Sequence, residues 1–410
     1  DGDPRALAQY LLNISHEVRE ILASLGLRSL GEARGRGDLL QLLAHPASVG
    51  DLDVRDMLAK VPEKIVTDPI SLEKDFSIDD SLVEQIRAAL IERAEPAVLI
   101  EGVEMGNRFK SVGGQLSIDI ERMLNYELDA ATVADLPSVV EDDRGRRSLV
   151  DGSVTVTTQG SAGQSYGAFS NDGMRLVHTG TANDGVGKSQ GGGTIVILSP
   201  GGGGSQPGEN VLIGNFALFG ATGGRTFVQG EAGDRFAVRN SGATAVVEGI
   251  GDFGCEYMTN GAVLNLGSAG KGLGNGMSGG FVYQYDADGS TLANVSADSL
   301  LVFPITDTSH GDFHEAAVKL LLHWHVDATG SPLAERILSD WEAERSKFFC
   351  GMPRALLLYQ DADEILAAKG RKELLDELST SIATQRIRLF KEAYRGAHPV
   401  IGGRTPSGSE

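Results

Sequence analysis

The feature that most constrains this chain of 410 residues is a 19-residue repeat in its middle part. Between 154 and 302, short β-branched or apolar runs alternate with glycine. One turn of such a chain cannot bury its apolar face alone, so neighbouring turns must stack and share a core. The sequence therefore predicts a β-solenoid. The residues on the repeat are Gly204, Gly223, Gly242, Gly261 and Gly280, and Val228, Val247 and Leu266 keep the same step.

Composition separates this middle part from the two ends. Residues 151–290 hold 35 of the 54 glycines, whereas the flanks show apolar residues at the three- and four-residue steps of helices. A flexible linker would lack the Val, Ile and Leu that recur on the repeat, although Gly201–Gly208 reads as a loop. We expect a mainly β fold, a single-stranded right-handed parallel β-helix over 150–305, with flanking α-helical segments.

The predicted organisation has five parts. A charged, glycine-containing break at 142–147 sets the boundary before the β-helix, and helical patterns resume after Pro304, including 313–326, 332–348, 362–367 and 372–394. The predicted segments are an N-terminal part over 1–50 with a helical pattern from Arg5 to Leu42, a mixed α/β connection over 51–149, the β-helix over 150–305, C-terminal helices over 306–395 and a mobile tail over 396–410.

Charge and cysteine content exclude several classes of protein. The formal net charge of −20 repels phosphate backbones and anionic bilayers, so we expect neither nucleic-acid nor membrane partners. Two cysteines, Cys255 and Cys350, are too few for a disulfide scaffold, a four-thiolate metal site or a cysteine-ligated iron–sulfur cluster. A reducing, cytoplasmic setting fits this content, and no apolar run reaches the length of a membrane span.

Two glycine-rich segments partly match the sequence motifs of nucleotide-binding loops, but the helix that must follow such a loop is not predicted after either of them. Gly180–Ser189 ends in Gly-Lys-Ser, but no glycine stands at the spacing of a phosphate loop, and a strand pattern follows where a helix is needed. Gly249–Gly254 matches Gly-x-Gly-x-x-Gly and also lacks the following helix. Neither segment is expected to bind a nucleotide.

No polar cluster in the sequence identifies an active site, so we assign no catalytic, cofactor-binding or metal-binding residue. Four histidines lie within 16 residues, but no third ligand is specified and surface or capping roles are favoured. We interpret the two cysteines as small buried residues. We expect four asparagines to cap or form ladders at bends, where Asn tolerates positive φ. A carbohydrate-active face would need carboxylates on the repeat, and six do not follow it. The residues concerned are His310, His314, His323 and His325; Asn183, Asn215, Asn240 and Asn260; and Asp184, Glu231, Asp234, Glu248, Asp252 and Glu256.

Several segments in the middle of the chain are specific enough to carry a family resemblance. They are Gly160–Phe169, Ala182–Lys188, Gly192–Val196, Phe219–Arg225, Asp234–Gly242, Gly254–Thr259 and Gly276–Gly280. These segments resemble the C-terminal part of the glutamate synthase large subunit. The flanks are similar to the last helix of that family's FMN-binding barrel, through Glu17–Gly26, and to its C-terminal helices, through His325–Trp341. Phe253 stands where the family usually has His.

The resemblance implies that 1–50 is the tail of an FMN-barrel synthase domain and that 150–305 is the β-helix called the GXGXG domain. It implies a scaffold for a glutamate synthase-type oxidoreductase that converts glutamine and 2-oxoglutarate to glutamate. FMN and an iron–sulfur cluster would belong to the parent assembly, with no cofactor on this chain, and synthase and amidotransferase domains or subunits would be its partners in a larger oligomer. The alternative is a separate non-catalytic β-helix subunit, resembling that of N-methylglutamate synthase or formylmethanofuran dehydrogenase.

Overall fold

A computed structural model describes residues 4–41, 55–61, 75–142, 145–201, 210–310 and 313–354. The chain divides into two compact units, 1–74 and 75–410, which are described separately. The expected helices at 362–367 and 372–394, the tail at 396–410 and most of the expected loop at 201–208 lie outside the described residues.

The first unit is helical where it is described. Its longest element, α1, exposes most of its apolar side chains, with Leu7 and Tyr10 each 61% exposed. The helical elements are α1 (Pro4–Ser24), α2 (Leu30–Ala33) and two 3-10 turns over Gly37–Leu39 and Arg55–Leu58.

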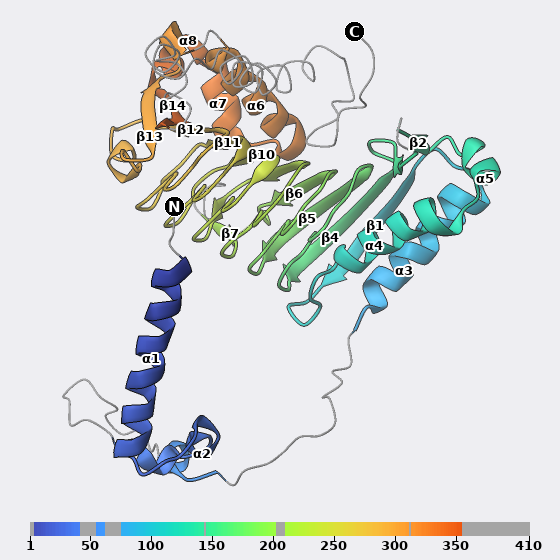
Figure 1. The fold of residues 1–410 in the computed structure, drawn as a ribbon. Coiled ribbons are helices and arrows are strands. Elements are labelled where there is room, and N and C mark those ends of the chain that lie inside the picture. The colour runs from blue at the N-terminus through green and yellow to red at the C-terminus, as the bar shows by residue number, and fades with distance from the viewer. Residues whose placement is uncertain are drawn as a thin grey trace, which may run out of the picture. The chain divides into compact units, whose positions relative to one another are not determined.

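The second unit is built on a β-solenoid of about six turns, as the sequence predicted (Figure 1). Its rungs run in the order β1-β4-β5-β6-β8-β10-β11-β12, all paired in parallel, while β7 and β9 form part of a second side. The strands are β1 (Val98–Met105), β4 (Val154–Ala162), β5 (Met174–Ala182), β6 (Thr194–Leu198), β7 (Val211–Ile213), β8 (Arg225–Val228), β9 (Glu231–Ala232), β10 (Ser241–Val247), β11 (Asn260–Asn265) and β12 (Phe281–Tyr285).

Register confirms the repeat and shows where it varies. Thr244 pairs with Arg225, and Ala262 pairs with Phe281, so each partner lies 19 residues away. Thr194 pairs instead with Arg225, 31 residues along the chain, because extra residues lie between β6 and β7, while β7 itself keeps its place beside Ala182 of β5 and beside β9. Solenoids tolerate such insertions because each rung contacts only its neighbours.

Both faces of the central rungs are buried, which explains their nearly continuous apolar sequences. In β6, Ile195 and Ile197 face the lumen between the sides of the solenoid, while Val196 faces outward. The outer face of the later rungs is covered by helices that carry Leu321 and Ile337 (Figure 1). These helices are α6 (His314–Thr329), α7 (Pro332–Ser339) and α8 (Trp341–Glu344).

Separate elements cover the two ends of the stack. At the β1 end, α3 and α4 each continue into a π-helical turn, and their apolar side chains join the lumen core (Figure 1). At the other end, β14 pairs antiparallel with both β12 and β13. The charged segment 142–147 connects β2 to β3 within this second unit. The elements are α3 (Ser77–Ile86), α4 (Gly114–Arg122), α5 (Ala130–Ala134), β2 (Val139–Glu141), β3 (Arg147–Leu149), β13 (Leu300–Pro304) and β14 (Phe348–Pro353).

The C-terminal helical pattern is confirmed for α6 and α7, but the predicted helix over 332–348 is too long. Its last residue, Phe348, begins β14 instead, and its buried ring packs against Tyr285 and Trp341. Pairing with the last solenoid rung therefore overrides the helical pattern.

Among the described residues, no helix is both long and apolar enough to cross a membrane.

Close approach between rungs makes specific glycines necessary. Gly180 has φ of +138°, and a methyl group added to it would overlap the carbonyl oxygen of Gly160 on the neighbouring rung.

We expect Gly180→Ala to lower the free energy of unfolding by roughly 3 kcal/mol, from backbone strain and overpacking together. Gly289 has φ of +81° with open space around it, so Gly289→Ala should cost only about 1 kcal/mol. Equal losses in chemical denaturation would contradict the close-packing argument.

Candidate functional site

Six stacked segments form one side of the solenoid in an unusual left-handed conformation. In every segment the second, fourth and sixth residues have positive φ, as in Gly185 (+77°), Gly187 (+62°) and Ser189 (+56°). We call this side the left-handed corner. Its segments are 164–169, 184–189, 215–220, 234–239, 252–257 and 271–276.

Backbone hydrogen bonds explain this conformation. The N–H of Gly185 donates to the next turn, at the carbonyl of Asn215 (2.9 Å), whereas the N–H of Gly187 donates to the preceding turn, at Tyr166 (2.9 Å). The N–H of Ser189 donates forward again, to Phe219 (2.8 Å). Alternating positive φ thus directs successive donors to both neighbouring turns, and the same pattern repeats in the first five segments. In the last segment, Gly274 still donates back to Gly254, while Gly276 donates to the side chain of Ser299. The bonds offset a left-handed cost of roughly 1–2 kcal/mol per non-glycine residue.

The two nucleotide-like segments lie largely on this corner. In 184–189, the N–H groups of Gly185, Gly187, Lys188 and Ser189 all donate to backbone carbonyls. Their donors are therefore committed to the stack and cannot cradle a phosphate, which needs several free N–H groups. In 249–254, the N–H of Phe253 likewise donates to Lys271 (2.8 Å). The glycine spacing in both segments serves the fold.

A ladder of polar side chains runs along the first position of the corner. The Oδ1 of Asp184 accepts the N–H of Asn215 (2.7 Å), Asn215 accepts from Asp234 (2.9 Å), Asp234 accepts from Asp252 (2.8 Å) and Asp252 accepts from Lys271 (3.1 Å). The steps are 31, 19, 18 and 19 residues. The carboxylates do not keep the 19-residue step, as expected, but Asp184, Asp234 and Asp252 still share one position in the structure because the turns differ in length. Each of the three holds a backbone N–H of the next turn, which is a structural role.

The asparagines act through their side chains, not through their backbone conformation. Asn240 is buried and closes its bend with three hydrogen bonds, accepting from Gly242 and Ala243 and donating to the carbonyl of Ala243. Asn183 and Asn260 each accept the N–H of the residue that follows them. The expected capping is confirmed, but none of the four asparagines has positive φ.

A buried polar cluster joins the solenoid to the helical layer, which consists of α6, α7 and α8. Glu248, just after β10, accepts hydrogen bonds from Ser331, which caps α7, and from His325 Nε2 on α6 (3.0 Å). The side chains of Glu248 and His325 are completely buried. Glu248 Oε2 and His325 Nδ1 have no hydrogen-bond partner among the described residues. One carboxylate oxygen therefore holds both α6 and α7 on the solenoid. His325 and Ser331 lie 77 and 83 residues after Glu248, so no local sequence pattern could have predicted these contacts.

The structure does not bring the four histidines together. His314 is buried among aromatic rings, including Phe303 (5.2 Å between ring centroids), while His323 is exposed on the opposite side of α6 from His325. The side chain of His310 lies outside the described residues. In the part of the chain that the structure describes, no three His, Cys, Asp or Glu side chains could hold a metal ion.

Both cysteines are buried, as predicted, and they lie in different cores. Cys255 faces the lumen and Cys350 faces the helical layer. Burial raises the pKa of each thiol well above its usual value. Because a thiolate is the reactive and metal-binding form, neither side chain is suited to nucleophilic or ligand chemistry.

A second buried polar network lies in the lumen near the β1 end. Thr158 Oγ1 contacts both Tyr166 Oη and His178 Nδ1 at 2.9 Å, and His178 Nε2 lies 2.9 Å from the carbonyl oxygen of Thr181. Burial lowers the pKa of His178 and raises that of Tyr166, so both stay neutral near pH 7. The network is satisfied within the chain.

Asp79 on α3 is a buried acid that contacts the start of α4. Its Oδ1 accepts the backbone N–H groups of Gly113 (2.8 Å) and Leu116 (2.9 Å) at the start of α4. Burial raises the pKa of Asp79 to about 6, against the lowering effect of the two N–H groups. This carboxyl group ties α3 to α4 and thereby closes the end of the solenoid.

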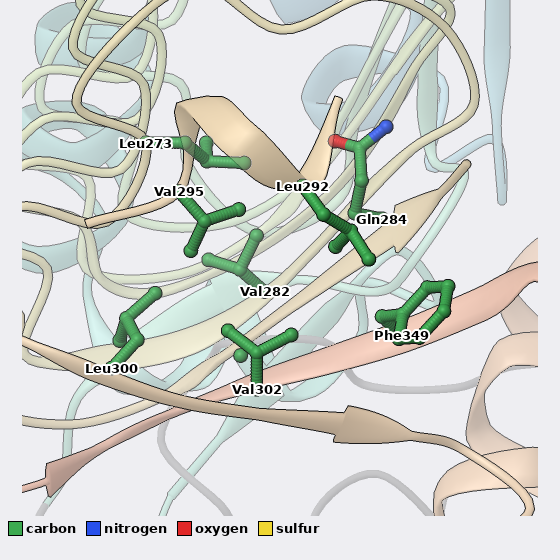
Figure 2. Close-up of a pocket in the computed structure, with 9 residues that line it drawn as sticks. Leu273, Val282, Gln284, Leu292, Val295, Leu300, Val302 and Phe349 are labelled. Atoms are coloured by element: carbon green, nitrogen blue, oxygen red, sulfur yellow. The ribbon is translucent and has the colours of Figure 1, made fainter. Parts of the chain in front are cut away.

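The end of the stack near β13 contains a small apolar cavity (Figure 2). Val282, Leu300 and Val302 point into it, and it holds no more than about one water-sized sphere. Its polar neighbour Gln284 already donates to the carbonyls of Gly267 and Tyr285. The cavity cannot take a flavin or an iron–sulfur cluster.

Comparison with known proteins gives consistent matches. A family model described as the GXGXG motif matches residues 115–354. The glutamate synthase [NADPH] large chain of Azospirillum brasilense is 38% identical over 357 residues, and that of Bacillus subtilis 36% over 356. The glutamate synthase [NADH] of Schizosaccharomyces pombe is 36% identical over 356 residues. These alignments cover 86–87% of this chain but only 16–22% of the relatives.

The buried Glu248–His325 pair predicts strong thermodynamic coupling. Glu248→Leu or His325→Leu alone leaves a buried polar partner unpaired and should lower the free energy of unfolding by about 3 kcal/mol or more. The double variant replaces the pair by apolar side chains and should lose at least 1 kcal/mol less than the sum of the two single losses. Denaturant titrations of the four proteins measure this difference, and strict additivity would contradict the pairing.

Asp79 predicts a pH dependence of stability. Because its pKa is higher in the folded chain than the unperturbed 3.8, the folded state gains stability below about pH 4 and loses it as pH rises through about 6. Relative to Asp79→Asn, the wild-type chain should lose up to about 3 kcal/mol between pH 4 and 7.5. The matched control is Glu84→Gln at an exposed position of the same helix. Its stability should run parallel to that of the wild-type chain, and a parallel curve for Asp79→Asn would refute the assignment.

Proposed function

Because this chain belongs to the GXGXG-motif family and corresponds to the C-terminal portion of the glutamate synthase large subunit, we propose that it is the scaffold portion of a glutamate synthase-type oxidoreductase. The single observation that carries the proposal is similarity at 36–38% identity along most of this chain, confined to 16–22% of each relative. The chain spans about a fifth of the length of these relatives, so the rest of such a protein supplies the other domains.

The architecture supports a scaffold role. The corner commits its backbone donors to the stack, and the helical layer is fixed by a buried carboxylate. A rigid solenoid with little internal freedom is suited to holding other domains at fixed positions. In this proposal, residues 1–50 close an FMN-binding barrel, and synthase and amidotransferase domains are the partners, in a cytoplasmic assembly.

The described residues do not fit the cofactors that the resemblance implies. Cys255 and Cys350 are buried in separate cores, whereas a cluster needs at least three thiolates at one centre. FMN needs free backbone donors for its phosphate, and the corner has already used those of 184–189. FMN and the iron–sulfur cluster are therefore assigned to the rest of the assembly.

In the proposed reaction, glutamine and 2-oxoglutarate yield glutamate in the assembly, and this chain contributes no reacting group. A separate assembly subunit of another enzyme is not favoured, because the relatives that match are named glutamate synthases. The electron donor differs among relatives, whose names specify NADH, NADPH or ferredoxin.

The proposal predicts that the purified chain by itself binds no flavin and forms no glutamate from glutamine and 2-oxoglutarate. The measurements are absorbance near 450 nm and a glutamate assay with an electron donor. Activity should require the catalytic part of the synthase, supplied on the same polypeptide or as a second one. Stoichiometric flavin, or turnover by the chain without that part, would overturn the scaffold assignment.

As a control, the catalytic part should be assayed with and without this chain. We expect full glutamate formation only when both are present, because the barrel needs its closing helix and its support. Equal activity of the catalytic part without the chain would also contradict the proposal.

A further inference from the structure

The last two positions of the left-handed corner carry a continuous strip of aromatic and cationic side chains. Phe169, Phe219 and Tyr257 are 49%, 38% and 51% exposed. The backbone bonds of Phe169 to Lys188, Ser189 to Phe219 and Tyr257 to Asn275 place these positions in one ladder along neighbouring turns. We call Phe169, Lys188, Phe219, Arg239 and Tyr257 the corner strip.

Exposed aromatic residues are concentrated on this strip. Among the described residues of the second unit, Tyr126 is the other aromatic side chain with comparable exposure. The strip also holds its cations against aromatic faces: Lys188 Nζ lies 6.0 Å from the centroid of Phe219, and Arg239 Cζ lies 5.9 Å from that of Tyr257. Aromatic rings with arginine on a rigid backbone are the composition of interface hot spots.

Folding alone does not account for these side chains. Phe169, Arg239 and Tyr257 have φ of +60°, +54° and +54° at the sixth position of their segments. The same position holds Gly220 and Gly276 in other turns, so the corner accepts residues that are free of this strain. Bulky side chains here cost roughly 1 kcal/mol or more each, and Phe169 and Tyr257 still leave about half of their surface in solvent. Such strain on exposed residues points to a role outside the fold.

The charges of the strip define what could bind there. No ion pair joins Lys188 or Arg239 to an acidic side chain within the described part of the chain, whereas the nearby Glu256 accepts a hydrogen bond from Asn275 (3.2 Å). Both cations therefore keep N–H donors for a carboxylate of a partner. On a chain of net charge −20, this cationic and aromatic strip stands apart from its surroundings.

We propose that the corner strip docks the catalytic part of the glutamate synthase-type assembly, through carboxylate and aliphatic side chains of that part. This inference rests on the proposed function, since the chain matches only 16–22% of its relatives and the remaining length must be held by the scaffold. Lys188 and Arg239 bind the carboxylates, and the three aromatic rings bury the aliphatic groups between them.

The test measures association between this chain and the catalytic part of the synthase from the same organism, expressed as a separate polypeptide. Asparagine tolerates positive φ, so the strip variant combines Phe169→Asn, Arg239→Asn and Tyr257→Asn. We expect its dissociation constant to rise at least tenfold while its melting temperature stays equal or increases, because strain is removed.

The matched control is Tyr126→Asn, which removes an exposed aromatic ring (83% exposed) away from the strip and should leave binding unchanged. If the wild-type chain binds and the strip variant binds equally well, the strip proposal fails while the proposed function stands. If the wild-type chain does not bind the catalytic part at all, the proposed function fails and takes the strip proposal with it. A matching loss of affinity in the control would refute the assignment to the strip.

Discussion

The stacking of backbone hydrogen bonds at the left-handed corner is the interaction on which the rest of this structure depends. Each turn gives donors alternately to the turn before and the turn after, which requires positive φ at every second residue. Few L-residues adopt that conformation freely, so glycine takes several positions, and bulkier residues carry strain that the ladder offsets. Once the corner is fixed, the strands on the other side are fixed in register, and the lumen core closes between them.

A stack of this kind leaves two ends and one long outer face to be covered. The helices near β1 close one end, with Asp79 holding the start of α4, and the β13–β14 ribbon closes the other. The helical layer covers the outer face of the later rungs and is fixed by Glu248. Asp79 and Glu248 therefore lie where separate layers meet, and their hydrogen bonds specify which surfaces fit together.

The same constraint explains the structural use of segments that resemble binding motifs. Glycine-rich loops bind phosphate only when their backbone donors are free, and the corner uses those of 184–189 internally. Asp184, Asp234 and Asp252 each use Oδ1 to hold a backbone N–H of the next turn, so these carboxylates have a role in the stack. What the corner leaves available is its outer side-chain strip, which is a surface for recognition.

The sequence by itself determined the solenoid and its repeat, because a stacked turn must place Val, Ile and Leu on one face and glycine where backbones approach. It also identified the family and the burial of Cys255 and Cys350. Only the tertiary structure decided which distant groups meet: Glu248 with His325 and Ser331, the carboxylate ladder, and Phe348 as a strand. These contacts join residues on different turns or layers, at separations that vary with inserted segments. A fixed period in sequence could not reveal them, since hydrogen bonds depend on position in space.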